Sequence, residues 1–123
     1  MRNGKQADGK QSLRDILHKV YKHESLAGVD LRNLYLSCMD FSELDLRRAN
    51  FEGCRLSFAI MEGCDLDGTN FANANLTNVS FKGAKLSGVR FAGAIVAGAD
   101  FSGAKGLSPE VKKYLKFKGA AGL

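Results

Sequence analysis

The chain has 123 residues, and its content of 45% hydrophobic and 25% charged residues is typical of one soluble globular domain. No stretch approaches the ~18 consecutive apolar residues of a membrane span, and residues 1–10 lack the apolar core of a secretory signal. Three cysteines are too few, and odd in number, for a disulfide framework. We therefore expect a cytoplasmic protein that does not associate with a membrane.

The formal net charge of +5 is unevenly distributed. Residues 29–67 carry a net charge of −4, whereas residues 1–28, 68–107 and 108–123 each carry +3. The positive charges lie in the terminal segments and the second half, without an arginine-rich cluster. Because solvated terminal helices account for them, we do not expect direct nucleic-acid binding.

The N-terminal part of the chain contains a predicted helix. Residues 1–11 are polar, and we expect them to form a disordered tail. Ser12 followed by Asp15 has the spacing of a capping box, which begins an α-helix. This pattern predicts an N-terminal helix over 12–27, and Gly28 ends the connection to the next segment. The apolar residues of the helix share one face: Leu13, Ile16, Leu17, Val20 and Tyr21.

A repeat of five residues dominates the middle of the chain. Every fifth residue is large and apolar over fifteen consecutive positions. A second series, two residues earlier, is mostly small and apolar, and the residue between the two is mostly polar or charged. Residues two apart point to the same side of an extended segment, so each unit predicts a short strand with one outward polar residue. The large apolar positions are Leu31, Leu36, Phe41, Leu46, Phe51, Leu56, Met61, Leu66, Phe71, Leu76, Phe81, Leu86, Phe91, Val96 and Phe101.

Each unit has to end in a corner. Two residues after the large apolar position, Gly or Asn is frequent, as at Gly53, Asn73 and Gly93. Both residue types tolerate the positive φ of a tight corner, so we interpret these glycines as structural.

The repeat resembles the pentapeptide-repeat family, whose motif runs roughly Ala–Asp/Asn–Leu/Phe–X–Gly. Residues 49–53 (Ala-Asn-Phe-Glu-Gly), 64–68 (Cys-Asp-Leu-Asp-Gly) and 99–103 (Ala-Asp-Phe-Ser-Gly) match it closely. The resemblance implies an all-β solenoid over residues 28–107, a right-handed quadrilateral β-helix of about four coils with about 20 residues in each.

In such a coil, residues 20 apart stack on one wall. We therefore expect phenylalanines from opposite walls to face one another across the shaft. In the first coil, the second series is bulky where later coils have mostly small residues, which predicts an apolar cover over that end of the shaft. These residues are Val29, Leu34, Met39 and Leu44. One wall carries Leu31, Phe51, Phe71 and Phe91, and the opposite wall carries Phe41, Met61, Phe81 and Phe101.

The C-terminal part contains a second predicted helix. Ser108-Pro109-Glu110 combines an N-cap, a proline at the first helical position and an acid in the first turn. It predicts a helix over 108–118, followed by a disordered tail over 119–123. We expect the two terminal helices to cap the open ends of the β-helix.

The oligomeric state stays open between a monomer and a homodimer. Resemblance to the quinolone-resistance members of the family, which dimerise through C-terminal elements, implies contacts through the C-terminal helix. The candidate dimer contacts are Tyr114, Leu115 and Phe117.

No group of residues indicates catalysis, metal binding or cofactor binding. His18 and His23 lie on the predicted N-terminal helix, outside the repeats that hold the cysteines. Cys54 and Cys64 occupy inward positions, and Cys38 lies at a corner, so we interpret all three as structural. The glycine-rich segments lack a Gly-Lys-Ser/Thr ending. We predict a protein that is not an enzyme and that carries no metal and no cofactor.

Four apolar residues interrupt the outward polar positions. Tyr35, Ile60 and Ile95 replace the polar residue of their units, and Phe58 replaces a corner glycine or asparagine. Phe58 and Ile60 are near neighbours and predict a small apolar surface. We predict a non-catalytic scaffold or protein–protein interaction module from a bacterial cytoplasm, with another protein as its partner.

The alternative function also comes from the family resemblance. Some pentapeptide-repeat proteins resemble duplex DNA in shape and charge, bind type II topoisomerases such as gyrase, and protect them from quinolones. A DNA mimic needs a long and strongly acidic rod. Residues 29–107 have a net charge of only −1 and form a shaft of only ~20 Å, so length and charge both weigh against it.

Overall fold

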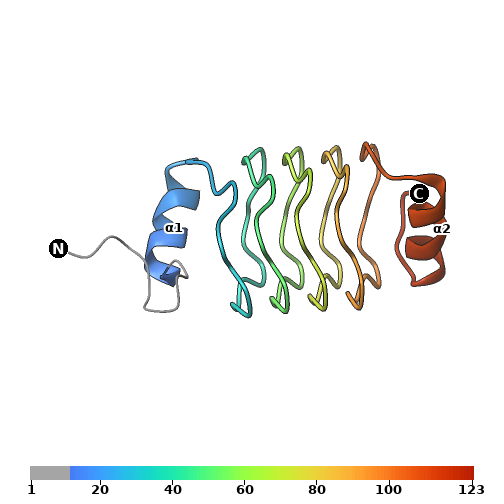
Figure 1. The fold of residues 1–123 in the computed structure, drawn as a ribbon, viewed down its shortest axis with the longest axis horizontal. Helices are drawn as coiled ribbons and strands as arrows, with labels where there is room; N and C mark the ends of the chain where they lie inside the picture. Colours follow the sequence, from blue (N-terminus) through green and yellow to red (C-terminus); the bar gives the residue numbers. More distant parts are fainter. Residues whose placement is uncertain (1–11) are drawn as a thin grey trace.

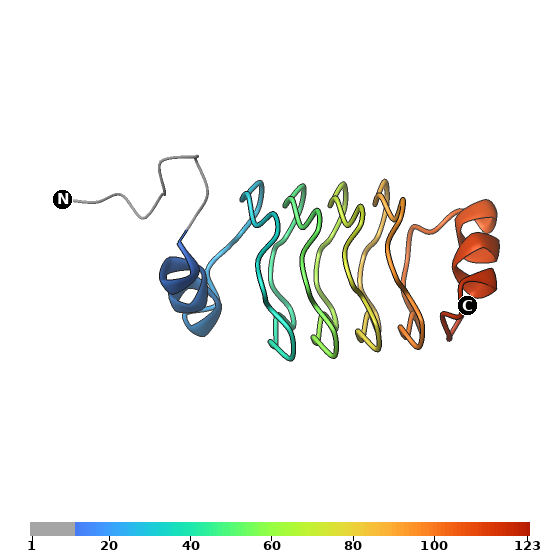
Figure 2. The same ribbon diagram turned by 90° about the horizontal axis from the view of Figure 1, so that it is seen from below.

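The computed structural model describes residues 12–123, which form a stack of coils between two helices. Helix α1 (Leu13–Tyr21) and helix α2 (Pro109–Phe117) lie at opposite ends of the stack (Figure 1). Two perpendicular views show the coils following one another along the longest axis (Figures 1 and 2). The described part of the chain is therefore a short rod.

Successive coils are joined by single parallel β-bridges between residues 20 apart. Four columns of bridges define four walls, and each wall is identified by its outward-facing residues. This register confirms the predicted stacking. Wall 1 carries residues 30, 50, 70 and 90; wall 2 carries 35, 55, 75 and 95; wall 3 carries 40, 60, 80 and 100; wall 4 carries 45, 65, 85 and 105.

The inside of the rod is a ladder of buried phenylalanines and aliphatic residues. On wall 1, the rings of Phe71 and Phe91 stack with centroids 6.1 Å apart, and on wall 3 those of Phe81 and Phe101 stack at 4.9 Å. Across the shaft, Phe71 meets Phe81 edge to face at 5.6 Å. Such aromatic pairs contribute ~0.5–1.5 kcal/mol beyond their buried area. The predicted facing of phenylalanines across the shaft is confirmed.

Every corner of the coils uses a left-handed backbone conformation. The residue two positions after each large apolar residue has φ between 57° and 72°. The predicted role of Gly and Asn at the corners is confirmed, but four corners use other residues: Cys38, Glu43, Arg48 and Phe58. Holding a residue with a Cβ in this conformation costs ~1–2 kcal/mol.

Helix α1 begins as the sequence predicts. The Ser12 Oγ accepts a hydrogen bond from the Asp15 N–H at 3.2 Å and donates one to the Asp15 carboxylate at 2.7 Å. The helix ends at Tyr21, so the prediction of a helix up to residue 27 was wrong. The chain leaves the helix because the buried Leu26 donates its N–H to the Asp45 carbonyl, 2.9 Å away, and so pairs with wall 4.

The predicted apolar face of α1 is only partly used. Ile16 is fully buried in the core of the rod, and Val20 packs against that core. Leu13, Leu17 and Tyr21 are exposed instead, because the narrow end of the shaft accommodates one side of the helix only.

Helix α2 also begins as predicted, since the Ser108 Oγ accepts a hydrogen bond from the Val111 N–H at 3.2 Å and Pro109 is the first helical residue. The prediction of a disordered tail over 119–123 was wrong. Ala121 pairs in parallel with Asp100, because the last strand of wall 3 offers backbone groups that the tail satisfies. The predicted tail over 1–11 lies outside the described residues.

Candidate protein-interaction surface

An Asp or Asn in the middle of a unit closes the corner that follows it. In eight units an Asp or Asn side chain accepts a hydrogen bond from the backbone N–H two residues later, at 2.9–3.3 Å. Asp40 accepts from Ser42 in this way, and Asn70 accepts from Ala72. The sequence indicated only that these residues face outward, whereas the structure shows that they also support the backbone.

The predicted surface residues cannot form this corner hydrogen bond. Tyr35, Ile60 and Ile95 occupy the Asp/Asn position with side chains that have no suitable acceptor for it. Phe58 occupies a corner at φ 63°, where most other units have Gly or Asn. At these four positions the residue is not the one that the fold itself favours.

Three of the four residues gather around one corner of the rod, between walls 2 and 3. Tyr35 is 70% exposed, Phe58 60% and Ile60 36%. The guanidinium of Arg55 lies 4.5 Å from the centre of the Tyr35 ring, a distance typical of a cation–π contact. The exposed thiol of Cys38 belongs to the same corner column as Phe58. We call this surface the corner patch: Tyr35, Cys38, Arg55, Phe58 and Ile60.

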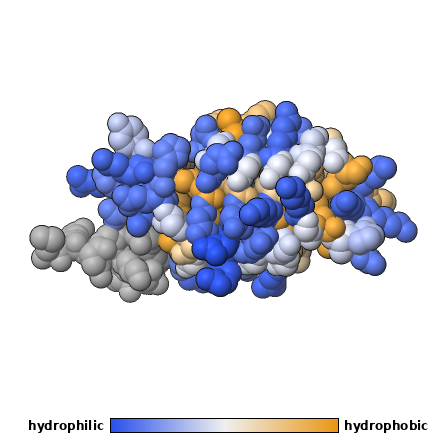
Figure 3. All heavy atoms as spheres, turned by 90° about the horizontal axis from the view of Figure 1, so that it is seen from above, coloured by the Kyte–Doolittle hydropathy of each residue, from blue (hydrophilic) through white to orange (hydrophobic). Residues whose placement is uncertain are grey.

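Ile95 does not belong to the corner patch. It lies on wall 2 with Tyr35, but Arg55 and Asn75 separate the two along the column of bridges. Ile95 is exposed and stands next to the C-terminal end of the rod. Figure 3 shows a face on which apolar side chains interrupt a mostly hydrophilic surface, both over the coils and towards the end opposite the grey residues.

One carboxylate, that of Asp40, lies next to the corner patch. The hydroxyl and the N–H of Ser42 hydrogen-bond Asp40, beside Ile60 on wall 3, and lower the pKa of its carboxyl. Asp40 is therefore ionised at neutral pH, and this side of the patch favours a partner with a basic group at its rim. On wall 4, away from the patch, the Arg47 side chain donates to both oxygens of Asp45 at 2.9 and 2.8 Å and lowers its pKa to about 2.

A model of pentapeptide repeats matches the chain in eight copies, over residues 25–63, 49–88 and 84–106. The chain belongs to the pentapeptide-repeat family. Its four walls are those of the right-handed quadrilateral β-helix of that family. No match to the chain is found among curated proteins.

Solved pentapeptide-repeat structures resemble the chain. Alr5209 from Nostoc PCC 7120 is 18% identical with a TM-score of 0.51, over 89% of this chain and 93% of that one. HetL from Nostoc sp. strain PCC 7120, involved in heterocyst differentiation regulation, is 28% identical with a TM-score of 0.37, over 62% of this chain and 40% of that one. A trypsin-treated form of QnrB1, a plasmid-mediated fluoroquinolone resistance protein, is 21% identical with a TM-score of 0.40, over 67% and 48%.

The cysteines of this pentapeptide-repeat protein have structural surroundings. Cys54 and Cys64 are fully buried, and their thiols hydrogen-bond the carbonyls of Leu31 and Phe41 at 2.8 and 2.9 Å. Burial raises the pKa of Cys64 to about 12. Within residues 12–123, no three His, Cys, Asp or Glu side chains lie close enough to hold a metal ion. No helix in the same range is long and apolar enough to cross a membrane.

The predicted dimer contacts differ in accessibility. Leu115 is fully buried in the core of the rod, so its prediction as a dimer contact was wrong: the amphipathic helix turns this residue inward. Phe117 is 84% exposed and Tyr114 40% exposed, and both stay candidates. The ammonium of Lys118 lies 5.8 Å from the Tyr114 ring and 5.9 Å from the Phe117 ring.

Proposed function

We propose that this pentapeptide-repeat protein is a non-catalytic scaffold whose corner patch binds another protein. One observation supports this proposal most strongly. Phe58 and Ile60 replace residues that the fold favours, and both place exposed apolar surface on the same corner. Local departures from the rules of a fold are expected at functional sites.

The energies of the two residues support the same reading. Phe58 in the left-handed region costs ~1–2 kcal/mol relative to a relaxed backbone. Ile60 forgoes a corner hydrogen bond of ~0.5–1.5 kcal/mol. Both side chains are partly exposed, so their burial within the chain offsets only part of these costs in folding free energy. A partner that covers the patch would bury the rest of their apolar surface.

The surroundings of the patch suit protein recognition. Tyr35, Phe58 and Arg55 are of the residue types enriched at the energetic centres of interfaces. The backbone beneath them is held by bridges on both sides, since Arg55 pairs with Tyr35 and Asn75, and Ile60 pairs with Asp40 and Ser80. Such a preformed surface loses little conformational entropy on binding.

In this proposal the coils supply rigidity and the helices close the rod. We assign about four coils to residues 28–107, with Ile16 of α1 covering one end of the shaft and Leu115 of α2 the other. We assign the corner patch to binding because its exposed residues are mainly aromatic and aliphatic.

A second candidate function is that of a DNA-mimicking gyrase ligand. The net charge of −4 over residues 29–67 favours it, but the +3 over residues 68–107 opposes it along the same rod. A gyrase supercoiling assay with a quinolone separates the two functions. Protection of supercoiling by micromolar protein would support the mimic, whereas no effect at that concentration would remove it.

Cys38 offers a direct test of the corner patch, because it is exposed beside Phe58 while Cys54 and Cys64 are buried. A thiol-reactive photo-crosslinker is attached to Cys38 of the full chain, and the labelled protein is irradiated in a lysate of its source cells. We expect one reproducible protein adduct, identified by mass spectrometry and lost in the double variant Phe58→Gly/Ile60→Asn.

The matched control is Arg48→Gly/Lys85→Asn, labelled in the same way. Arg48 is a corner residue at φ 57°, and Lys85 occupies the Asp/Asn position on wall 4, away from the patch. The control should keep the adduct at the wild-type level. An adduct that survives in the Phe58→Gly/Ile60→Asn variant at full yield would refute the proposed site.

A further inference from the structure

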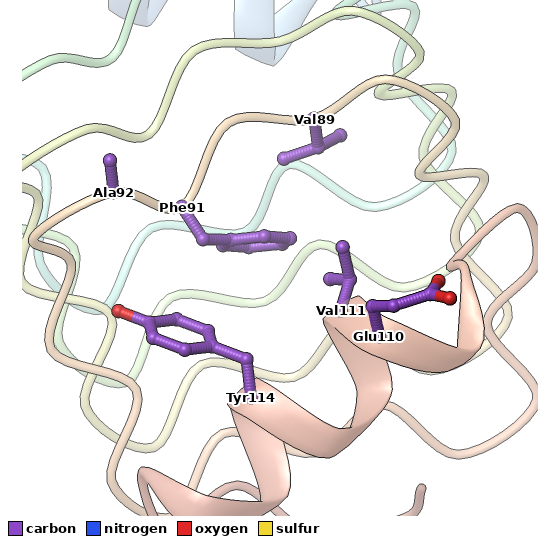
Figure 4. Close-up of a pocket in the computed structure, with 6 residues that line it drawn as sticks. All are labelled: Val89, Phe91, Ala92, Glu110, Val111 and Tyr114. Atoms are coloured by element: carbon purple, nitrogen blue, oxygen red, sulfur yellow. The ribbon is translucent and has the colours of Figure 1, made fainter.

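A groove of about 230 Å³ lies at the C-terminal end of the rod, between wall 1 and α2 (Figure 4). The Phe91 ring lies on one side of it, and Val111 points towards that ring from the helix. Small-molecule and cofactor sites usually measure ~300–1,000 Å³, so the groove better fits a single side chain of a peptide. It is lined by Val89, Phe91, Ala92, Glu110, Val111 and Tyr114.

The backbone beside this groove is an open sheet edge. Lower on wall 1, Phe71 donates its N–H to the carbonyl of Arg90 at 2.9 Å, and Asn50 donates its N–H to the carbonyl of Val29 at 2.9 Å. Within residues 12–123, the equivalent N–H of Phe91 and carbonyl of Val89 have no hydrogen-bond partner. Unpaired backbone groups on a terminal strand are a template for a further strand.

The chain itself shows how such an edge is filled. On wall 3, the Phe101 N–H donates to the Ala121 carbonyl at 2.9 Å, and the Ala121 N–H donates to the Ala99 carbonyl at 2.8 Å. Ala121 comes from beyond α2 and not from the next repeat, so the edge accepts a strand that is not continuous with the coils. Phe91 and Val89 are the corresponding donor and acceptor on wall 1.

The charge of the edge indicates the chemistry of its occupant. Arg90 is the outward residue of the last wall 1 strand, is exposed, and has no ion pair within residues 12–123. On wall 4, the basic Lys85 pairs in register with the acidic Asp65 of the neighbouring coil. An acidic residue on an added strand would lie beside Arg90 in the same way. Glu110 is the one carboxylate among the lining residues, and residues 108–123 carry +3 overall.

We propose that an extended segment of a partner protein adds to wall 1 as a parallel strand, with an apolar–acidic–apolar sequence. Its backbone bonds Phe91 and Val89, its acidic side chain lies beside Arg90, and its second apolar side chain enters the groove against Phe91 and Val111. This strand site uses other residues than the corner patch, so each proposal can fail without the other.

The probe is the capped peptide Ala-Gly-Ala-Asp-Phe-Ser-Gly, which copies residues 97–103 of the chain. It is titrated into the isotope-labelled full chain and followed by NMR. We expect shifts at Val89, Phe91 and Val111, and at least tenfold slower hydrogen exchange of the Phe91 amide at saturation. A peptide with Lys in place of Asp should bind about fivefold more weakly.

Two variants locate the site. Ala92→Trp fills the groove from an exposed corner position and should abolish binding, whereas Lys82→Trp, at the same repeat position on wall 3, should not. Arg90→Glu should reverse the preference for the Asp peptide, so that the Lys peptide binds more tightly. The control is Lys85→Glu, which changes an exposed lysine on wall 4 and should leave the preference for the Asp peptide unchanged.

Three outcomes would overturn the strand site. The first is no binding at millimolar peptide, and the second is binding that Ala92→Trp leaves intact. The third is slower exchange of the Phe91 amide on concentrating the protein without peptide, since the occupant would then be a second copy of this chain.

Discussion

Asp40 and Ile60 pair in register on wall 3, yet only Asp40 hydrogen-bonds the corner that follows it. Asp100 repeats the bond of Asp40 on the same wall, accepting from the Ser102 N–H at 2.9 Å. Ile60 therefore interrupts a column in which a polar residue would support the backbone. Together with Phe58, it is the basis of the proposed corner patch.

Replacing Phe58 by glycine should stabilise the fold. The corner at φ 63° is relaxed for glycine, and the side chain that is lost is 60% exposed. We expect the free energy of unfolding, measured by urea denaturation, to rise by about 1 kcal/mol. The reverse substitution at an equivalent corner, Gly83→Phe, should lower it by a similar amount, because nothing crowds that position and only backbone strain is added.

Ile60→Asn should leave stability nearly unchanged. The new asparagine side chain can accept a hydrogen bond from the Glu62 N–H, just as Asn70 accepts one from the Ala72 N–H. This hydrogen bond offsets the loss of the partial apolar contact of Ile60. We expect a change below about 1 kcal/mol by urea denaturation. Phe71→Ala in the shaft should instead cost about 3–5 kcal/mol. A loss of that size at Ile60 would show that the residue is part of the core.

Thiol labelling should distinguish the three cysteines. In the native chain one thiol, Cys38, should react with a disulfide reagent at pH 8 within minutes, because Cys54 and Cys64 are fully buried and the pKa of Cys64 is raised to about 12. The Cys38→Ser variant should show no fast-reacting thiol, and all remaining thiols should react in denaturant. Fast labelling of a second thiol in the native chain would contradict the burial of the inward series.

Acid should weaken the corners. The pKa values of Asp40, Asp45 and Asp100 are lowered by hydrogen bonds to their carboxylates, to about 2 for Asp45. Their stabilising effect is present above the unfolded pKa of ~3.9 and is lost as the pH falls towards 2. Thermal unfolding should occur at lower temperature at pH 2.5 than at pH 5. Asp→Asn at all three positions keeps an acceptor and should reduce this dependence.

The walls follow from the five-residue repeat together with the 20-residue coil that the family resemblance implies. Given that coil, the spacing of Phe71, Phe81, Phe91 and Phe101 leaves one arrangement for their side chains. The exposure of Tyr35, Phe58 and Ile60 follows from the same register. These residues were identified because they break the pattern, and not because they match a motif.

Other features depend on backbone contacts that side-chain patterns do not encode. Ala121 joins wall 3 through its N–H and carbonyl, and an alanine carries no sign of that pairing. Leu26 leaves the helical pattern because wall 4 offers it hydrogen bonds. The corner bonds of the Asp and Asn residues were missed for a related reason: an outward polar residue is already explained by contact with water.

One paired experiment on the double variant Phe58→Gly/Ile60→Asn tests the central claim that these residues serve a partner and not the fold. Urea unfolding and capture of the Cys38-crosslinked partner are quantified on the same preparation, next to Arg48→Gly/Lys85→Asn. The account predicts an unfolding free energy equal to or above that of the wild type, with loss of the partner adduct in the first variant only. A variant destabilised by more than about 2 kcal/mol, or one that keeps its partner, would contradict it.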